Sequence, residues 1–244
     1  MRTCAVLLFA SVCLGQAGDR KGEDQPPLPE DLQVPPAPVL DVEDALASFT
    51  IEDGFRIDAV AFEPFVEDPV AMEIDARGRF WVVEMRGYMP NIDGTDELEP
   101  VGRISILEDT DGDGVMDRST AFLDDLVLPR AICLTEDGAL VVEPPHLLLC
   151  RDLDGDDRAD TKEILASGFK GLDSPEHAGN GLMRSIDNWI YCSQHPLRFR
   201  FDGIALISEP TPGHGQWGLT MDDEGRNYVS YNSSPVHIDL YPQH

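Results

Sequence analysis

The residues of this chain best suited to chemistry are aspartates spaced as in a calcium-binding loop. In a first loop they occupy positions 1, 3, 5 and 9, with Gly114 at position 6, where the loop needs a sharp turn. The same spacing returns 43 residues further along the chain. Carboxylate oxygens are the ligands that calcium prefers, so the spacing predicts two structural calcium sites. The predicted ligands are Asp109, Asp111, Asp113 and Asp117 in the first loop and Asp152, Asp154, Asp156 and Asp160 in the second.

Each loop departs from the calcium pattern in a different place. Position 12 normally holds a glutamate that binds the ion with both carboxylate oxygens. The first loop has Thr120 there, whereas the second has Glu163, which joins the predicted ligands of that loop. The second loop has Asp157 in place of the glycine at position 6. The two loops are therefore imperfect copies with different defects.

The spacing of 43 residues also indicates how the chain folds. It lies within the range expected for one blade of a β-propeller, a unit of four antiparallel strands. An apolar strand, a tight polar turn and a second apolar strand recur four times, with Asp-Gly and Asp-Asn among the turns. The sequence therefore predicts an all-β fold, a β-propeller of four-stranded blades of which this chain covers about four. The paired first and second strands are expected at 71–75 and 80–83, 131–135 and 140–142, 182–186 and 189–191, and 219–221 and 227–229. Third strands are expected at 103–107, 147–150, 197–201 and 237–240, and fourth strands at 119–123, 161–165 and 205–208.

Two insertions interrupt the repeat. Gly78 and Gly138, at equivalent turns, are 60 residues apart, which places 17 extra residues within about 86–101. Asn188 lies 50 residues beyond Gly138, which places seven more around 170–177. Long insertions in repeat proteins tend to lie on the binding face.

Most histidines share a face with these insertions. Strand direction alternates within a blade, so second-to-third strand connections and blade-to-blade connections lie at one end of the sheets. We call this end the histidine face and the opposite end, which carries the acidic loops, the turn face. Loops often carry functional sites, so this clustering marks the histidine face as the candidate functional face. His146, His195 and His237 lie at the first kind of connection, and His177 and His214 at the second.

The N-terminal region reads as an export signal followed by a tether. Arg2, a short apolar run and small residues before position 18 predict a secretory signal peptide over residues 1–17, too short to span a bilayer. A lipoprotein site at Cys13 is disfavoured by the large side chain of Val12. We expect the chain to be exported to the periplasm or outside the cell.

Residues 18–48 are polar and proline-rich, which predicts an extended, disordered linker before a β-domain at 49–244. Within that domain, the alternating residues 55–60 predict a further strand. The three tryptophans, Trp81, Trp189 and Trp217, are expected to fill gaps between blades.

Composition narrows the classes of partner. The net charge of −28 argues against nucleic acid or an anionic membrane surface, because both demand a basic face. No transmembrane span is expected. Three cysteines remain after the predicted signal, and this odd number leaves at least one free thiol or an intermolecular disulfide. They are Cys133, Cys150 and Cys192.

Several motifs resemble one known family. They are Asp68-Pro69-Val70-Ala71-Met72, the stretch from Trp81 to Tyr88, the two acidic loops, and Asn188-Trp189-Ile190-Tyr191. Through them the chain from about residue 49 onward resembles a family of membrane-bound dehydrogenases of planctomycete-type bacteria. That family is similar to the soluble glucose/sorbosone dehydrogenases. The resemblance implies a six-bladed propeller and, in some members, pyrroloquinoline quinone used together with calcium.

The resemblance also implies roles for single residues. In quinoprotein dehydrogenases a histidine before a glycine-containing strand accepts the hydroxyl proton of the substrate, and His177 matches that position. A neutral imidazole suits this role as general base. Arg86 and Tyr88 on the first insertion have side chains that bind anionic or sugar-like ligands. The implied reaction is dehydrogenation of a sugar or other alcohol, with a cytochrome as a candidate electron acceptor. Further candidate binding residues are Asn180, His195 and His214.

Two hypotheses stay open. The first is the exported dehydrogenase, and the second is a calcium-stabilised propeller that binds a ligand without turnover. In the second, Arg86 and Tyr88 anchor their loop and His177 only packs. A propeller that stops in its fourth blade leaves an open sheet edge, so the sequence also predicts that this chain is part of a longer protein.

Overall fold

The computed structural model describes residues 38–91, 93–203, 205–213 and 215–239. The chain divides into two units, residues 1–45 and 46–244, and every described strand belongs to the second. The predicted signal peptide, Cys13, most of the expected linker and His214 lie outside the described residues. Among the described residues, no helix has the length and hydrophobicity needed to cross a membrane.

A short helix, α1 (Val42–Ala47), forms within the expected linker. The carboxylate of Asp41 accepts a hydrogen bond of 2.9 Å from the backbone N–H of Asp44, which caps the helix at its start. Acidic residues in the first turn favour the same end through the helix dipole. The proline content predicts an extended chain up to Pro38. The capping by Asp41 explains why a helix begins at Val42.

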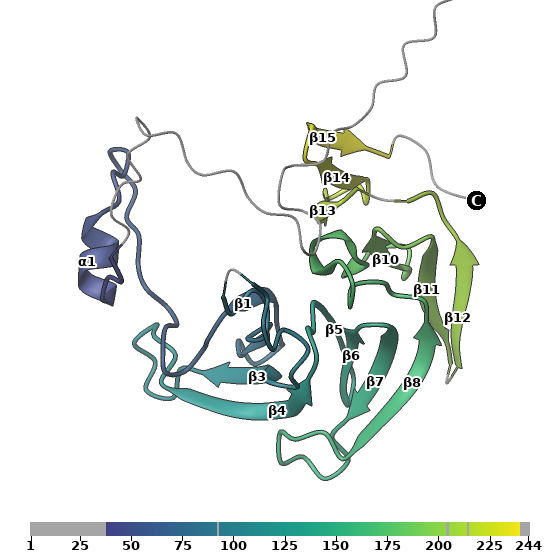
Figure 1. The fold of residues 1–244 in the computed structure, drawn as a ribbon, viewed down its shortest axis with the longest axis horizontal. Helices are drawn as coiled ribbons and strands as arrows, with labels where there is room; N and C mark the ends of the chain where they lie inside the picture. Colours follow the sequence, from purple (N-terminus) through teal and green to yellow (C-terminus); the bar gives the residue numbers. More distant parts are fainter. Residues whose placement is uncertain (1–37, 92, 204, 214, 240–244) are drawn as a thin grey trace, which may run out of the picture. The chain divides into compact units, whose positions relative to one another are not determined.

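The second unit is built from antiparallel meanders (Figure 1). Within each of them, consecutive strands pair along the chain, and the parallel bridge between Ala131 and Gly181 joins two meanders into one eight-stranded sheet. The first meander is β1 (Pro69–Ile74), β2 (Phe80–Glu84), β3 (Gly102–Glu108) and β4 (Arg118–Leu126). The second is β5 (Ala131–Thr135), β6 (Gly138–Glu143), β7 (His146–Arg151) and β8 (Thr161–Ser167). The third is β9 (Asn180–Arg184), β10 (Ile190–Ser193), β11 (Leu197–Asp202) and β12 (Ala205–Pro210), and the last described strands are β13 (Trp217–Met221), β14 (Asn227–Tyr231) and β15 (Ser234–Ile238).

One aspartate closes the first hairpin of three meanders in the same way. Asp75 accepts hydrogen bonds from the backbone N–H groups of Arg77 and Arg79 and, at 3.1 Å, from the indole of Trp81. The hydroxyl groups of tyrosines on β10 and β14 donate to the equivalent aspartates at 2.8 and 3.0 Å. These hydrogen bonds fix the turn and the second strand together, which explains why the pattern recurs at this spacing. The equivalent pairs are Asp187 with Tyr191 and Asp222 with Tyr228.

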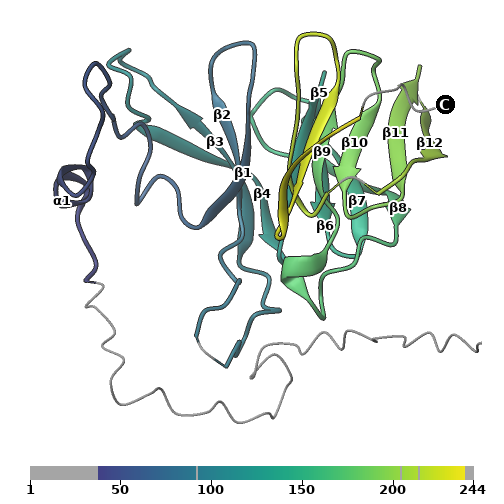
Figure 2. The same ribbon diagram turned by 90° about the horizontal axis from the view of Figure 1, so that it is seen from above.

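The meanders pack face to face, and the second has both faces covered (Figure 2). Along β6, Ala139 and Val141 pack with Trp81 and Phe122 of the first meander. Their neighbours on β6 face the opposite way, toward Phe199 of the third meander, because side chains alternate along a strand. This explains why β6 reads as a continuous apolar run.

The all-β prediction is confirmed, and each strand expected within the repeats overlaps an observed strand over its described residues. The strand expected at 55–60 is wrong. Phe55 and Val60 are exposed, and no strand forms there; one backbone hydrogen bond of 2.7 Å runs from Met116 to the carbonyl of Val60. Alternation stabilises a strand only where a neighbouring strand pairs with it, and this segment has no such partner among the described strands.

The tryptophans and cysteines have mixed outcomes. Trp81 fills the space between the first two meanders, as expected. Trp189 is buried beneath the guanidinium groups of Arg198 and Arg200 of its own meander, and Trp217 is 38% exposed. The three cysteines are free and buried.

Candidate functional site

The acidic loops lie between β3 and β4 and between β7 and β8, at equivalent places in the first two meanders. In each loop the carboxylates at positions 1, 3 and 5 have ligand oxygens within 4.8 Å of one another. Three convergent carboxylates are a donor set that fits calcium. Hydrogen bonds from backbone N–H groups, chiefly that of Gly114, lower the pKa of Asp109. The convergent groups are Asp109, Asp111 and Asp113, and Asp152, Asp154 and Asp156.

Of the three remaining predicted metal ligands, two form hydrogen bonds within their loop instead. Asp117 accepts hydrogen bonds from the backbone N–H and the hydroxyl group of Thr110, at 3.0 and 2.7 Å. Asp160 accepts one of 2.6 Å from the N–H of Leu153. Glu163 lies on β8 and is exposed. Within the described structure none of the three belongs to a carboxylate trio.

Asp157 has a role that the calcium pattern does not suggest. Its carboxylate accepts a hydrogen bond of 2.7 Å from the guanidinium of Arg79, which is 9% exposed and also pairs with Asp75 at 2.7 Å. The backbone of Asp157 has φ +65°, the conformation that favours glycine at this position. The residue therefore links the second acidic loop to the β1–β2 turn of the neighbouring meander.

The two sequence insertions meet on the histidine face. The hydroxyl of Tyr88, in the loop after β2, donates a hydrogen bond of 2.8 Å to the carboxylate of Glu176, in the connection between β8 and β9. Burial and the charge of Glu176 raise the pKa of Tyr88 to about 12. A 3-10 turn at Pro175–His177 carries the exposed His177, with its Nδ1 3.4 Å from the hydroxyl oxygen of Ser174. One hydrogen bond thus brings Tyr88 to the turn that carries His177.

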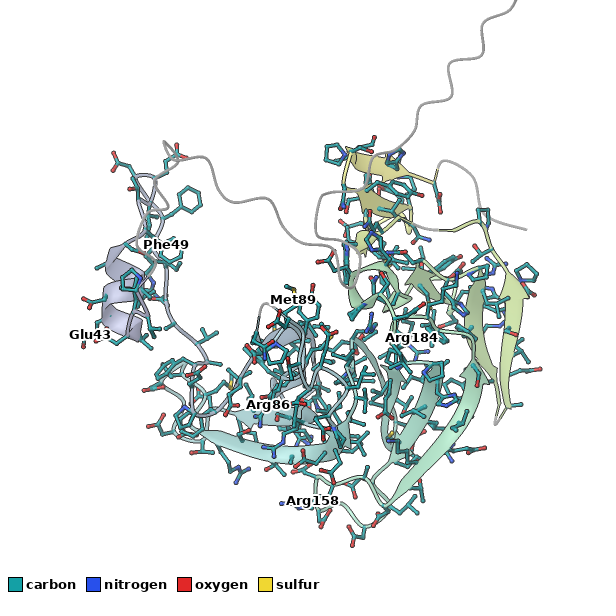
Figure 3. The ribbon with its side chains drawn as sticks, in the orientation of Figure 1. Glu43, Phe49, Arg86, Met89, Arg158 and Arg184 are labelled. Atoms are coloured by element: carbon teal, nitrogen blue, oxygen red, sulfur yellow. The ribbon has the colours of Figure 1, made fainter. Side chains whose placement is uncertain are left out.

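Arg86 anchors its loop. Figure 3 labels Arg86 among the side chains of the structure. The guanidinium of Arg86 donates to the buried carboxylate of Glu84 at 2.6 and 2.9 Å and lies 3.6 Å from Glu67. The same carboxylate accepts hydrogen bonds from the N–H of Glu67 and the hydroxyl of Ser105. The guanidinium of Arg86 is therefore already paired with carboxylates of the protein and holds its loop in place.

Asn180 and His195 are packed rather than open. The amide of Asn180 donates to the carbonyl oxygens of Ala178 and Gln216 at 3.0 and 2.9 Å. The ring of His195 is 4% exposed and stacks on Phe169 with 3.9 Å between centroids, and this burial lowers its pKa. Both side chains join the third meander to its connections.

Arg130 is the residue that the sequence analysis missed. It directly precedes β5 and is 3% exposed. Its Nη1 donates to the carbonyl of Pro175 at 2.6 Å and its Nε to that of Leu128 at 3.4 Å, whereas its Nη2 is buried without a partner. The available signal was an arginine just before an apolar strand, in the connection between β4 and β5.

The turn face carries a cavity of about 550 Å³. Its charged lining includes Arg151, which pairs with Asp137 at 3.1 Å, and Arg184, which donates to the carbonyl of Leu134 at 3.3 Å. The charge of Arg151 is thus paired, and Arg184 is exposed to water, which distinguishes both from the buried Arg130.

A family model described as a domain of unknown function, DUF7133, matches residues 41–244. The chain therefore belongs to this family. No curated protein matches its sequence.

Proposed function

We propose that this member of the DUF7133 family is a β-propeller of the six-bladed type whose histidine face oxidises a sugar or other alcohol. The meanders are its successive blades. This architecture is supported by their first strands, since β1 contacts β5, β5 contacts β9, and β9 contacts β13. Face-to-face packing of consecutive meanders supports the same arrangement.

The observation that carries the catalytic proposal is the exposure of His177 where the two inserted segments meet. An exposed imidazole on a short turn can reach a substrate hydroxyl, and the Tyr88–Glu176 hydrogen bond holds that turn against the first blade. In this proposal His177 accepts the hydroxyl proton as the alcohol carbon is oxidised. The resemblance to sugar and alcohol dehydrogenases suggests the class of substrate.

The residues present fit a carboxylate-bearing cofactor, because Arg130 offers a buried guanidinium nitrogen without a partner on this face. A bound pyrroloquinoline quinone would supply the two-electron acceptor that oxidation of an alcohol requires, with a cytochrome as the next acceptor. Arg130 would hold a carboxylate of the quinone, Tyr88 and Glu176 would fix the turn, and His177 would take the proton. The acidic trios on the turn face would hold structural calcium.

Substitution of His177 tests this proposal in the protein reconstituted with calcium and the quinone. His177→Gln should keep the fold and quinone binding but lower turnover by roughly a hundredfold to ten-thousandfold, the usual contribution of a positioned general base. The pH–rate profile is a second readout, since the acid limb produced by a histidine base should disappear. His237→Gln is the matched control and should retain parental turnover, because the described contacts of His237 are with Ser234, at 2.8 Å, and the ring of Tyr231, both within its own meander. Equal turnover in His177→Gln and the parent protein would remove His177 from the mechanism.

The second candidate is a calcium-stabilised binding module without turnover, which the two carboxylate trios favour. Absorbance after reconstitution separates the two functions. A quinone spectrum that is bleached by added sugar supports the dehydrogenase. A calcium-dependent shift in melting temperature, with no bleaching by any sugar or alcohol, supports the binding module.

A further inference from the structure

The environment of Arg130 differs from that of the other buried arginines in the described structure. Arg79 pairs with Asp75 and Asp157, and Arg198 pairs with Glu209 at 2.9 Å. Among the described residues Arg130 forms no ion pair or hydrogen bond with a carboxylate. Buried charges are normally paired, because taking a charge out of water is costly.

The hydrogen bonds of Arg130 leave part of its charge uncompensated. Two of its nitrogens donate to the carbonyl oxygens of Leu128 and Pro175, and Nη2 has no partner. Burial lowers the pKa of Arg130 to about 10, so the guanidinium keeps its charge at neutral pH. The planar fork of a guanidinium is suited to bind a carboxylate through two parallel hydrogen bonds.

Both inserted segments surround this guanidinium. A Cβ on Gly171 would lie 2.9 Å from Cζ and Nη1 of Arg130, so the backbone of the β8–β9 connection presses directly on it. The charge of Glu97, from the loop after β2, raises the pKa of Arg130 against the effect of burial. Tyr88 of the same loop bonds to Glu176, next to the Pro175 carbonyl that accepts from Arg130. Arg130 therefore lies where the two segments converge, next to the turn that carries His177.

We propose that Arg130 is the anchor of a site for a carboxylate-bearing ligand, covered by residues 170–177. The ligand carboxylate bonds to Nη2 and replaces the carbonyl of Pro175 at Nη1. This inference rests on the proposed function for its ligand class: the carboxylate belongs either to a sugar acid that serves as substrate or to the quinone.

Entry of the ligand requires the cover to move, because Nη2 is shielded from solvent. In the described structure, the hydrogen bonds that tie residues 170–176 to neighbouring elements are those of Pro175 with Arg130 and of Glu176 with Tyr88. Gly168 and Gly171 have φ of +104° and +129°, where glycine gives the backbone freedom to rearrange. Opening of the cover would therefore break two hydrogen bonds, with the glycines at its N-terminal end able to adopt another backbone conformation.

The experiment measures binding by isothermal titration calorimetry and amide hydrogen exchange of residues 170–177. Sodium gluconate and pyrroloquinoline quinone are the two carboxylate probes, and glucose is the uncharged control. The parent protein should bind at least one carboxylate probe, with altered exchange in the cover. Arg130→Met should weaken that binding at least tenfold and abolish the change in exchange. Arg198→Met, which removes a buried arginine far along the chain, should leave the affinity unchanged.

The outcomes separate the sources of the carboxylate. If Arg130→Met weakens the binding of gluconate alone, the site belongs to the substrate. If it weakens the binding of the quinone alone, the site belongs to the cofactor. If Arg130→Met does not fold, Arg130→Lys keeps the charge without the planar fork and should still weaken binding several-fold. The proposal would be overturned if the Arg130 variants bound the probes as tightly as the parent, or if the parent bound neither probe. Arg130 would then serve only to hold the β8–β9 connection in place. These readouts do not depend on turnover, so a failure of His177 as base leaves them interpretable.

Discussion

At the scale of single residues, the clearest departure from a motif has a structural cause. Asp157 replaces the glycine of a calcium loop and keeps the glycine-like φ of +65°. Its carboxylate reaches Arg79 of the neighbouring meander, and the arginine side chain is only 10% exposed. Gly114 at the equivalent position of the first loop has φ +94°. Aspartate is less suited than glycine to this positive φ, but it provides an ion pair between two meanders.

A double-mutant cycle measures that contact. Asp157→Asn and Arg79→Met should each destabilise the fold, and their coupling free energy should be about 1–2 kcal/mol, because the pair is largely buried and Arg79 keeps Asp75 as a second partner. Urea unfolding of the four proteins gives the coupling. The control cycle uses Arg56→Met and Asp58→Asn, an exposed pair that should couple by well under 1 kcal/mol. A coupling near zero for Arg79 and Asp157 would mean that the link contributes nothing to stability.

At the scale of elements, strands were predictable and connections were not. The hairpin turns carry local signals, such as Asp75 with Gly78, and β6 is apolar because both of its faces are covered. The segment 55–60 shows the limit, since alternation alone does not supply a pairing partner. The lengths of the two insertions were readable from the repeat, but the meeting of Tyr88 with Glu176, 88 residues apart, depends on how the meanders pack. For the same reason no local pattern marked Arg130.

The acidic loops carry a prediction at this scale. Asp111→Ala combined with Asp154→Ala should lower the melting temperature in calcium by about 5–10 °C, because an ion bound only to the folded state stabilises it by mass action. Differential scanning calorimetry with and without a chelator provides the measurement, and chelation should bring the parent down to the level of the variant. Glu163→Ala is the matched control and should melt like the parent, since Glu163 lies outside the carboxylate trios. Insensitivity of the parent to both calcium and chelator would rule out calcium at these loops.

At the scale of the whole β unit, burial is uneven across the first meander. Ala71 packs into the core shared with the second meander, whereas Val70, Met72 and Ile74 of β1 point to the other side and are 47%, 53% and 57% exposed. Part of that opposite face is covered, because Val66 and Met116 pack against Val82 and Leu107 of the same sheet. The three β1 side chains are left as an apolar stripe beside this covered part.

This stripe predicts self-association. Contiguous exposed apolar surface on a soluble protein favours burial against a partner, and a second copy is the partner present in a purified sample. Sedimentation velocity should therefore show a concentration-dependent increase in mass for the parent protein. Met72→Lys with Ile74→Lys should reduce association at least tenfold, because two charges would have to be desolvated in the contact. Ile164→Lys, which charges a similarly exposed residue on the outer strand β8, should associate like the parent. If the parent protein stays monomeric at high concentration, the prediction is wrong and the β1 stripe remains exposed to water. The double lysine variant would then sediment like the parent.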